Sequence, residues 1–143
     1  MKIFVQPNPK LTEAFRTRLL QEWSEVDSFE GAHEGVSVPG PIIAADEQGR
    51  FIGGLSFTSA YRPNGEDICV WVNTVLVDPN HRGQGIASVL IEEAEHTALQ
   101  TGIVELFVLS EFPALYTKRQ WEVIGAHNQE SILTKSLQVQ GAR

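Results

Sequence analysis

Two glycines, Gly83 and Gly85, closely follow Arg82 and directly precede an apolar pattern of helical period. The first turn of a helix has N–H groups without partners and carries the positive end of the helix dipole, so it can hold a phosphate. Because glycine has no Cβ, an anion can approach the backbone closely at both positions. Arg82 can add a charge-assisted hydrogen bond to the anion, and the small side chain of Ala87 leaves room for it. The spacing therefore predicts a phosphate-binding turn at the start of a helix.

Two common phosphate-binding patterns do not fit this segment. A P-loop requires Gly-Lys-Ser or Gly-Lys-Thr at the helix start, and neither stands there. A dinucleotide site requires Gly-x-Gly-x-x-Gly, but Ser88 occupies the last position. Glu105 follows at the spacing of a ribose-binding acid, yet it begins its expected strand, whereas that acid should end it. The dinucleotide interpretation is therefore disfavoured.

The residues around this turn predict a strand–helix–strand unit. Ile68–Val77 is almost continuously apolar, as expected for a central strand buried on both faces. The helix should begin near Gly85 and stop at Gly102. Val104–Leu109 is the next strand, parallel to the first through a right-handed crossover. The helix has a buried stripe and an acidic outer face, formed by Ile86, Leu90, Ile91, Ala94 and Ala98 and by Glu92, Glu93 and Glu95, respectively.

The rest of the chain predicts a mixed sheet with covering helices. Apolar residues spaced by three or four predict a helix over Leu11–Val26, which Thr12 can cap, followed by an acidic loop over 27–41. Gly53-Gly54 indicates a bulge or a close backbone approach. We therefore expect an α/β (α+β) fold in a single domain, 1–143, with a mostly antiparallel sheet and helices on both faces. The other expected elements are strands at Lys2–Gln6, Ile42–Ala45, Phe51–Thr58, Trp121–Gly125 and Ile132–Leu137 and a short helix at Pro113–Arg119.

Composition narrows the function classes. With 18 acidic and 11 basic residues the formal net charge is −7, which disfavours a nucleic-acid-binding surface. No apolar run approaches the roughly 18 residues that span a bilayer, so no membrane partner is expected. The start of the sequence stops far short of a signal-peptide core, so a cytoplasmic setting is the default expectation. The single cysteine, Cys69, rules out an internal disulfide, and its apolar neighbours favour a buried side chain over a reactive thiol. No His, Cys and Asp cluster has metal-ligand spacing, so no metal is expected.

Residues Arg82–Ala87 resemble the Arg/Gln-x-x-Gly-x-Gly/Ala motif of the GNAT superfamily of N-acetyltransferases. Ala114–Glu122 is similar to the family's A-x-x-L-Y-E-K-x-G-F-E region, with Gln120-Trp121 in place of glycine and phenylalanine. Gly49–Gly54 also resembles an early hairpin of the family. The resemblance thus covers roughly residues 42–125.

This resemblance implies an acetyl-coenzyme A-dependent enzyme that transfers the acetyl group directly to a primary amine of a small molecule or a peptide. It also implies that the two parallel strands splay apart and that the thioester enters the gap. Tyr116 matches the family tyrosine proposed to protonate the leaving thiolate; the other interpretation is a tyrosine packed between helix and sheet, with its hydroxyl on a backbone carbonyl. The resemblance places the pantetheine arm beside Val75, Leu76 and Val77 and the pyrophosphate on the backbone N–H groups of Arg82, Gly83, Gln84, Gly85, Ile86 and Ala87.

The general base and the acceptor stay open. Histone-type members of the family carry a glutamate on the strand before the motif, but Trp71 occupies the matching position. Asn73 faces the same way and can hold a water, so we expect deprotonation through water and name no base. The aromatic residues Trp23, Phe29, Trp71 and Tyr61 are candidates for lining an acceptor pocket, in which Asp27 or Glu30 would attract an ammonium group. The simpler interpretation makes Trp23 and Phe29 core residues of the first helix and its exit.

Two other functions are compatible with the same fold. The first is a binding module that keeps coenzyme A but has lost catalysis, as a sensor or regulatory partner. The second is a toxin-type enzyme that acetylates charged tRNA, which the net charge of −7 disfavours. Since dimers are common in the family, a homodimer is a further expectation.

Overall fold

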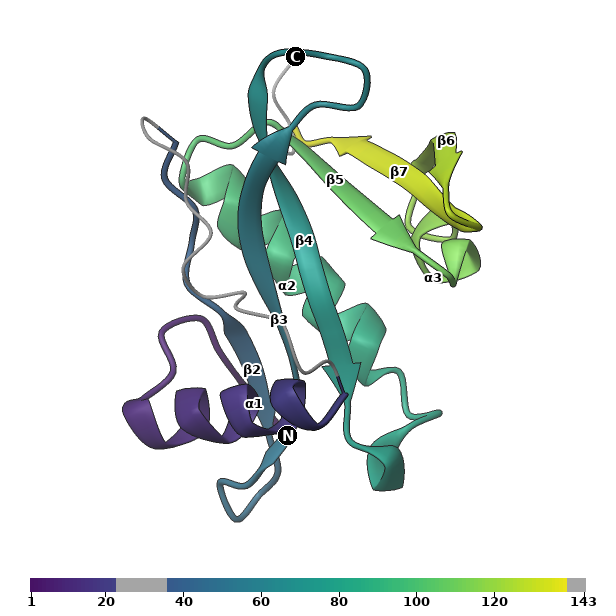
Figure 1. Ribbon diagram of the computed structural model, residues 1–143. Helices are drawn as coiled ribbons and strands as arrows, with labels where there is room; N and C mark the ends of the chain where they lie inside the picture. The colour runs from purple at the N-terminus through teal and green to yellow at the C-terminus, as the bar shows by residue number, and fades with distance from the viewer. Residues whose placement is uncertain (23–35, 139–143) are drawn as a thin grey trace.

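The computed structural model describes residues 1–22 and 36–138, and its strands form a seven-stranded sheet (Figure 1). Strands β4 and β5 are parallel, and the other neighbouring strands are antiparallel. The predicted mixed sheet, mostly antiparallel with one parallel pair, is confirmed. Along the sheet the order is β1 (Lys2–Phe4), β2 (Ile42–Ala45), β3 (Phe51–Tyr61), β4 (Ile68–Val77), β5 (Glu105–Ser110), β7 (Glu130–Ser136) and β6 (Glu122–His127).

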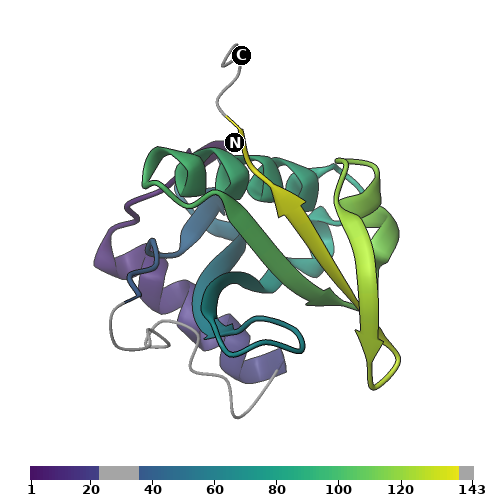
Figure 2. The same cartoon turned by 90° about the horizontal axis from the view of Figure 1, so that it is seen from above.

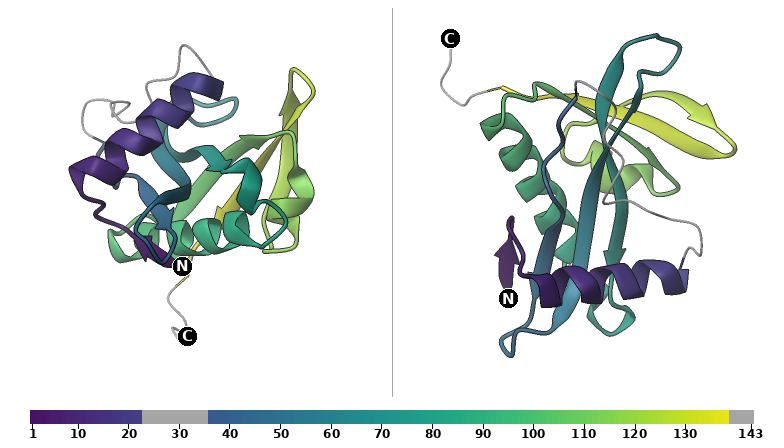
Figure 3. Two further views of the ribbon diagram at one scale, coloured as in Figure 1. Left: turned by 90° about the horizontal axis from the view of Figure 1, so that it is seen from below. Right: turned by 60° about the vertical axis from the view of Figure 1, so that its left-hand side comes forward.

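Helices cover both faces of this sheet. The long helices are α1 (Pro9–Glu22) and α2 (Ile86–Gln100), and the short ones are η1 (Pro79–His81) and α3 (Pro113–Thr117). Figure 2 shows α1 and α2 on opposite sides of the sheet, and the view from below in Figure 3 agrees. The α3 helix lies on the α2 side, because its Tyr116 joins the buried cluster that also contains the α2 side chains. None of the described helices is long and apolar enough to cross a membrane.

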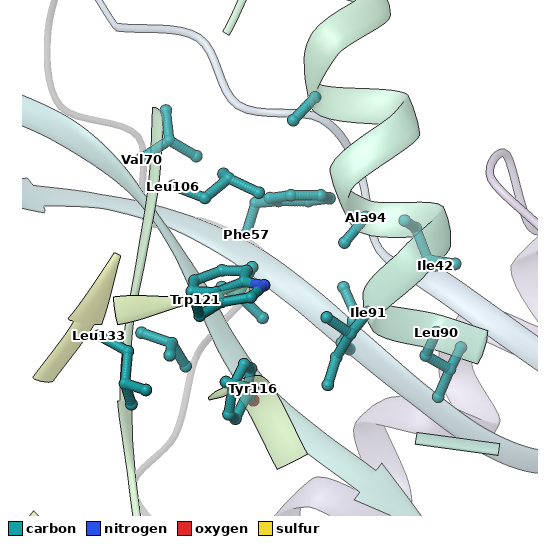
Figure 4. Packing of buried hydrophobic residues seen from close by; sticks show 14 of the residues in the cluster. Ile42, Phe57, Val70, Leu90, Ile91, Ala94, Leu106, Tyr116, Trp121 and Leu133 are labelled. Atoms are coloured by element: carbon teal, nitrogen blue, oxygen red, sulfur yellow. The ribbon is translucent and has the colours of Figure 1, made fainter. Parts of the chain in front are cut away.

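The larger part of the core lies between α2 and the sheet (Figure 4). All five α2 residues of the predicted stripe are buried, and they pack against strand residues such as Phe57, Val70 and Leu106. Full burial of one large aliphatic side chain contributes about 1.5–3 kcal/mol, so the stripe fixes the rotation of α2 and the direction of its first turn. On the opposite face, Leu11, Phe15 and Leu19 of α1 pack against Ile43, Ala45 and Leu76.

The start of α1 differs from the prediction. Asn8, rather than Thr12, caps the helix: its Oδ1 accepts a hydrogen bond from the backbone N–H of Leu11 at 2.8 Å. Pro9 follows as the first helical residue, where its missing N–H costs nothing. The predicted end at Val26 lies outside the described residues.

The two adjacent glycines of β3 are required by close contacts, as predicted. A Cβ on Gly53 would lie 3.1 Å from the carbonyl oxygen of Leu76, and a Cβ on Gly54 would lie 3.1 Å from the ring of Phe15. Phe15 therefore packs directly on the β3 backbone. This contact seats α1 against the sheet.

Glu95 does not lie on the outer face of α2, where the helical pattern placed it. Its side chain is only 12% exposed. Its two carboxylate oxygens accept hydrogen bonds from Arg119 Nε and Nη2, both at 3.0 Å, from Trp121 Nε1 at 2.9 Å and from Lys135 Nζ at 2.9 Å. The residue thus joins α2 to β7 and to the segment after α3.

Several element ends also differ from the prediction. β3 continues past Thr58 to Tyr61, and α3 ends at Thr117 rather than Arg119. β6 and β7 are joined by a two-residue turn, Asn128-Gln129, in which both residues have positive φ, 50° and 71°. Turns of this kind match the right-handed twist of a hairpin, so both strands extend further towards the turn than their apolar residues indicate.

Candidate functional site

Strands β4 and β5 separate soon after they meet. Beyond their paired segment β4 continues to Val77 and β5 to Ser110. Figure 1 shows the two arrows diverging there, so the expected splaying of the parallel pair is confirmed. The parallel pairing comprises only Val70 with Leu106, Trp71 with Phe107 and Val72 with Val108.

A bulge bends β4 where it leaves β5. Gly54 of β3 pairs with Leu76, but Ser56 pairs with Asn73, so β4 carries one additional residue in this interval. Thr74 lies in the bulge with φ 49°, a conformation that β-branched residues rarely adopt and that costs about 1–3 kcal/mol. Asn73 Oδ1 accepts from the backbone N–H of Thr74 at 2.8 Å, and the hydroxyl groups of Ser56 and Thr74 are 2.7 Å apart. These side-chain contacts hold the strained backbone at the gap.

A cleft of about 1080 Å³ opens at this gap. Val70 and Val72 pack in the core beneath α2, so strand alternation turns Trp71 and Asn73 to the opposite face, the side of α1. Side chains from both faces line the cleft, which therefore passes through the plane of the sheet. The prediction that β4 is buried on both faces is wrong for its second half, because Asn73 is exposed in the cleft.

The start of α2 lies in the same cleft. Gly85 is the N-cap residue in the left-handed conformation, with φ 80°, and no side chain of the described residues caps the helix. Gly83 has φ 79°, and a Cβ on either glycine would meet no atom of residues 1–22 and 36–138 within 4 Å. Both glycines line the cleft. The N–H groups of the first turn therefore border open space, the arrangement that suits an anion.

Asp78 holds the loop that carries this turn. Its Oδ1 accepts from Arg18 Nη1 of α1 at 2.7 Å, and its Oδ2 accepts from the backbone N–H of Asn80 at 3.1 Å. The same Oδ2 lies 3.0 Å from Nδ1 of His81. Hydrogen bonds from Arg18 and then from His81 hold the pKa of Asp78 below its usual value. The carboxylate therefore joins α1 to the residues that precede Arg82.

Asp78→Asn is expected to lower the free energy of unfolding by about 1–3 kcal/mol at pH 7, because the neutral amide cannot hold Arg18 by charge. A carboxyl with a lowered pKa in the folded state stabilises above its unfolded pKa of about 3.9, and this contribution is lost as pH falls through the folded value. The difference in the free energy of unfolding between the wild type and Asp78→Asn, measured by urea unfolding, should therefore narrow below about pH 4. The control is Asp67→Asn, in an exposed turn, and equal stabilities at pH 7 for all three proteins would contradict the role of Asp78.

Tyr116 combines burial with access to the cleft. Its side chain is 2% exposed and its ring lies edge-on to Trp121, with ring centroids 5.2 Å apart (Figure 4). Tyr116 also lines the cleft, and no described residue hydrogen-bonds to its hydroxyl, in contrast to the packing interpretation with a backbone partner. Burial raises the pKa of Tyr116 well above its usual value of 10.0. The hydroxyl therefore keeps its proton at neutral pH and can donate it.

Most of the residues predicted for the site come together in the cleft. Gln84 is exposed and does not line it, so contact through its backbone stays a prediction. Trp23, Asp27 and Phe29 lie outside the described residues. The residues that do line the cleft are Val75, Leu76, Val77, Arg82, Gly83, Gly85, Ile86 and Ala87 from the predicted cofactor segment, with Trp71, Asn73 and Tyr116.

Sequence reasoning missed several lining residues, including Glu22 at the end of α1 and Thr58 on β3. Thr58 pairs with Trp71 across the sheet, and only this register brings it to the gap. Four side chains of the described lining can accept a proton, namely His81 and the carboxylates of Glu22, Glu111 and Glu130, and none of them is assigned as the general base. The described residues also contain no group of three His, Cys, Asp or Glu side chains that could hold a metal ion.

A curated protein of similar sequence is named an N-acetyltransferase. The chain is 33% identical over 89 residues to the uncharacterized N-acetyltransferase YhbS of Escherichia coli strain K12, a match that covers 61% of this chain and 52% of the relative. The chain thus spans about half the length of the curated relatives it matches.

Solved structures have the same fold. The crystal structure of Escherichia coli YhbS in complex with CoA superposes with a TM-score of 0.68 at 22% identity, over 96% of this chain and 81% of that one. An aminoglycoside 6'-N-acetyltransferase complexed with coenzyme A gives a TM-score of 0.71 at 14% identity, over 99% and 100% of the two chains. The model of the acetyltransferase (GNAT) family matches residues 7–119. The splayed strands and the open glycine turn before α2 agree with this match, and the chain belongs to the GNAT acetyltransferase family.

Proposed function

We propose that this protein is an N-acetyltransferase that moves the acetyl group of acetyl-coenzyme A directly to a primary amine of a small molecule or a peptide. One observation carries the proposal: the uncapped glycine turn at the start of α2 and the gap between β4 and β5 open into the same cleft. An anion-binding turn alone would suit many ligands. An anion site that continues into a gap in the sheet suits a long molecule with a diphosphate in the turn and a thioester in the gap.

The residues of the cleft fit coenzyme A. The diphosphate would lie on the N–H groups of Arg82–Ala87, next to the Arg82 guanidinium. Beyond Val72, β4 has no paired neighbour on the β5 side among the strands that the structure describes, so the backbone of Val75–Val77 would pair with the amide groups of the pantetheine arm. Homologous structures solved with coenzyme A support this placement.

Within this arrangement, the neutral amine attacks the thioester carbonyl carbon, the C–S bond breaks and the sulfur leaves as a thiolate. We infer that Tyr116 donates its proton to this sulfur. Its hydroxyl reaches the cleft, lacks a described protein partner and remains protonated at neutral pH. The proton of the amine leaves through water, which Asn73 at the gap can hold, and no side chain of the described lining is assigned as the base.

Tyr116→Phe is expected to lower kcat on the order of 10²-fold while changing the affinity for coenzyme A less than about threefold, since the lost group acts on the leaving sulfur. The rate of thiol release at saturating substrate gives kcat, and calorimetry gives the affinity for coenzyme A. The matched control is Tyr61→Phe, because Tyr61 is 60% exposed and does not line the cleft. If Tyr116→Phe turned over as fast as the wild type across the pH range, Tyr116 would have a packing role alone.

A coenzyme A-binding module without catalysis is the second candidate, because no described residue is assigned as the base. A screen of amines, amino acids, polyamines, aminoglycosides and peptides for coenzyme A release separates the two functions. Release with any acceptor establishes the enzyme, whereas tight cofactor binding without release establishes the module. Acetylation of charged tRNA remains disfavoured by the net charge of −7. A homodimer and a cytoplasmic location stay predictions.

A further inference from the structure

Tyr116 reaches the cleft without a hydrogen bond to hold its hydroxyl. No described residue bonds to that oxygen, although the side chain is only 2% exposed. A proton donor must keep its hydroxyl within hydrogen-bond reach of the atom that it protonates. Without a bond at the hydroxyl, the side chain is held by the groups that pack against its ring. The direction of the Tyr116 hydroxyl therefore depends on the neighbours of this ring.

The aromatic neighbour of this ring is Trp121, which meets it edge-on (Figure 4). The two ring centroids are 5.2 Å apart, and the ring planes are inclined by 69°. An edge-to-face pair of this kind favours one relative orientation of its two rings. Trp121 is buried and is not among the residues that line the described part of the cleft, whereas Tyr116 is. The indole therefore supports the tyrosine without itself forming a wall of the cleft.

The backbone brings these two side chains together just after α3. The N–H of Trp121 donates to the carbonyl of Tyr116 at 3.2 Å, and the N–H of Gln120 donates to the carbonyl of Thr117 at 3.0 Å. Gln120 between them has a positive φ of 67°. This pattern is the Schellman motif, in which the residue after the left-handed one contacts a side chain of the last helical turn. Glycine usually takes the left-handed position, so the chain keeps the contact between the rings despite the strain of a glutamine there.

Glu95 fixes the other side of the indole to α2. Its Oε2 accepts from Trp121 Nε1 at 2.9 Å. Arg119 and Lys135 donate to the same carboxylate, so the acceptor of the indole N–H is itself held in place. The helix that carries Glu95 also carries the open glycine turn at its start. The support of Tyr116 and the proposed diphosphate site therefore belong to one helix.

We propose that Trp121 is a positioning residue for acetyl transfer: bound to Glu95, it keeps the Tyr116 hydroxyl directed at the leaving sulfur. This inference rests on the proposed function and adds a residue to its mechanism. As the amine forms the N–C bond, the C–S bond breaks and the Tyr116 proton moves to the sulfur. The proton that the amine releases to water then restores the phenol. Trp121 touches none of the reacting atoms and acts only through the neighbouring ring.

A double-mutant cycle with Tyr116→Phe tests the inference by activity. The probe reaction is the release of coenzyme A from acetyl-coenzyme A by hydroxylamine, a small amine that is largely neutral at pH 7, with the rate in the absence of protein subtracted. Trp121→Leu should lower kcat about tenfold and change the affinity for coenzyme A less than about twofold. Trp121→Phe keeps a ring at this position and should lower kcat only about threefold.

The second background decides between positioning and general stability. When Trp121→Leu is added to Tyr116→Phe, kcat should stay at the value of Tyr116→Phe, because no hydroxyl remains to be positioned. An equal loss in both backgrounds would overturn the inference. Circular dichroism checks that Trp121→Leu folds. Where it does not, Trp121→Phe takes its place in the cycle, with the same requirement that its effect disappear in Tyr116→Phe.

Crystal structures with bound coenzyme A test the position of the hydroxyl directly. In the wild type the Tyr116 oxygen should lie within hydrogen-bond reach of the coenzyme A sulfur. In Trp121→Leu it should move by about 1 Å or more, a displacement large enough for the expected loss of rate. Trp121→Phe should keep the oxygen close to its wild-type position. The same oxygen position in the wild type and in Trp121→Leu would overturn the inference.

The two experiments separate this inference from the proposed function. If neither hydroxylamine nor any amine of the screen released coenzyme A, but the hydroxyl moved in Trp121→Leu, the enzyme proposal would fail and the support of Tyr116 by Trp121 would stand. If coenzyme A were released, but the hydroxyl stayed in place and the effects of the two substitutions were independent, the enzyme would stand and the inference would be wrong.

Discussion

Gly85→Glu is expected to weaken acetyl-coenzyme A binding by at least about a hundredfold, because it places a carboxylate where the diphosphate should lie. Gly85 caps α2 with φ 80° and borders the cleft, and a Cβ there meets no atom of the described part of the chain within 4 Å. The new side chain therefore projects into open space rather than into the core. Calorimetry with coenzyme A measures the loss, and circular dichroism checks that the fold is retained.

The control for this variant is Gly102→Glu. Gly102 follows the other end of α2, has φ 89° and is also open within 4 Å, so both variants suffer the same strain of a side chain at positive φ. A glutamate is favourable near a helix N-terminus and unfavourable near a C-terminus, so Gly102→Glu should be the less stable of the two. It should nevertheless bind coenzyme A normally. If the folded Gly85→Glu variant bound coenzyme A with unchanged affinity, the proposed placement of the diphosphate at the α2 turn would be wrong.

The second large effect is expected at Glu95. Glu95→Gln should lower the free energy of unfolding by about 3 kcal/mol, because it leaves the charges of Arg119 and Lys135 without their buried partner. Urea unfolding at pH 7 measures this loss. The matched control is Glu92→Gln, which removes the other carboxylate near Arg119, 3.3 Å from its Nη1 but 72% exposed. An exposed pair contributes about 0–1 kcal/mol, so a similar loss in both variants would contradict the role of Glu95.

The pH dependence of the wild type should report the same carboxylate. Burial alone would raise the pKa of Glu95, but hydrogen bonds from Arg119, Lys135 and Trp121 outweigh it and the pKa is lowered. A lowered pKa in the folded state means that the group stabilises above its unfolded pKa of about 4.3 and that this contribution disappears as pH falls through the folded value. The difference in the free energy of unfolding between the wild type and Glu95→Gln should therefore narrow only below about pH 4.

The sequence predicted the parts of the fold that depend on local patterns. The period of the apolar residues in α2 located the helix and its buried face, and Gly102 marked its end. The apolar run of β4 and the glycine turn then defined the strand–helix unit and the candidate anion site. Each of these features depends on residues close together in the chain, which is why periodicity and spacing could find them.

The remainder depends on contacts between distant residues. The helical period predicted Glu95 on the exposed face of α2. The period is a local pattern and cannot show that Arg119 and Lys135, distant in the sequence, bind this carboxylate. Glu22 reaches the cleft only because Phe15 packs on Gly54 and seats α1 over the sheet. The bulge at Thr74 has no local signal either, since threonine is usually a good strand residue. Tertiary packing decides all three.

The short pairing between β4 and β5 has a further consequence. Only three residue pairs join these neighbours, so the second half of β4 presents amide groups that no described strand satisfies on that side. A molecule that hydrogen-bonds along this edge substitutes for the missing strand and closes the sheet. Whatever occupies the gap then forms part of the architecture, and the ligand and the folded chain stabilise each other.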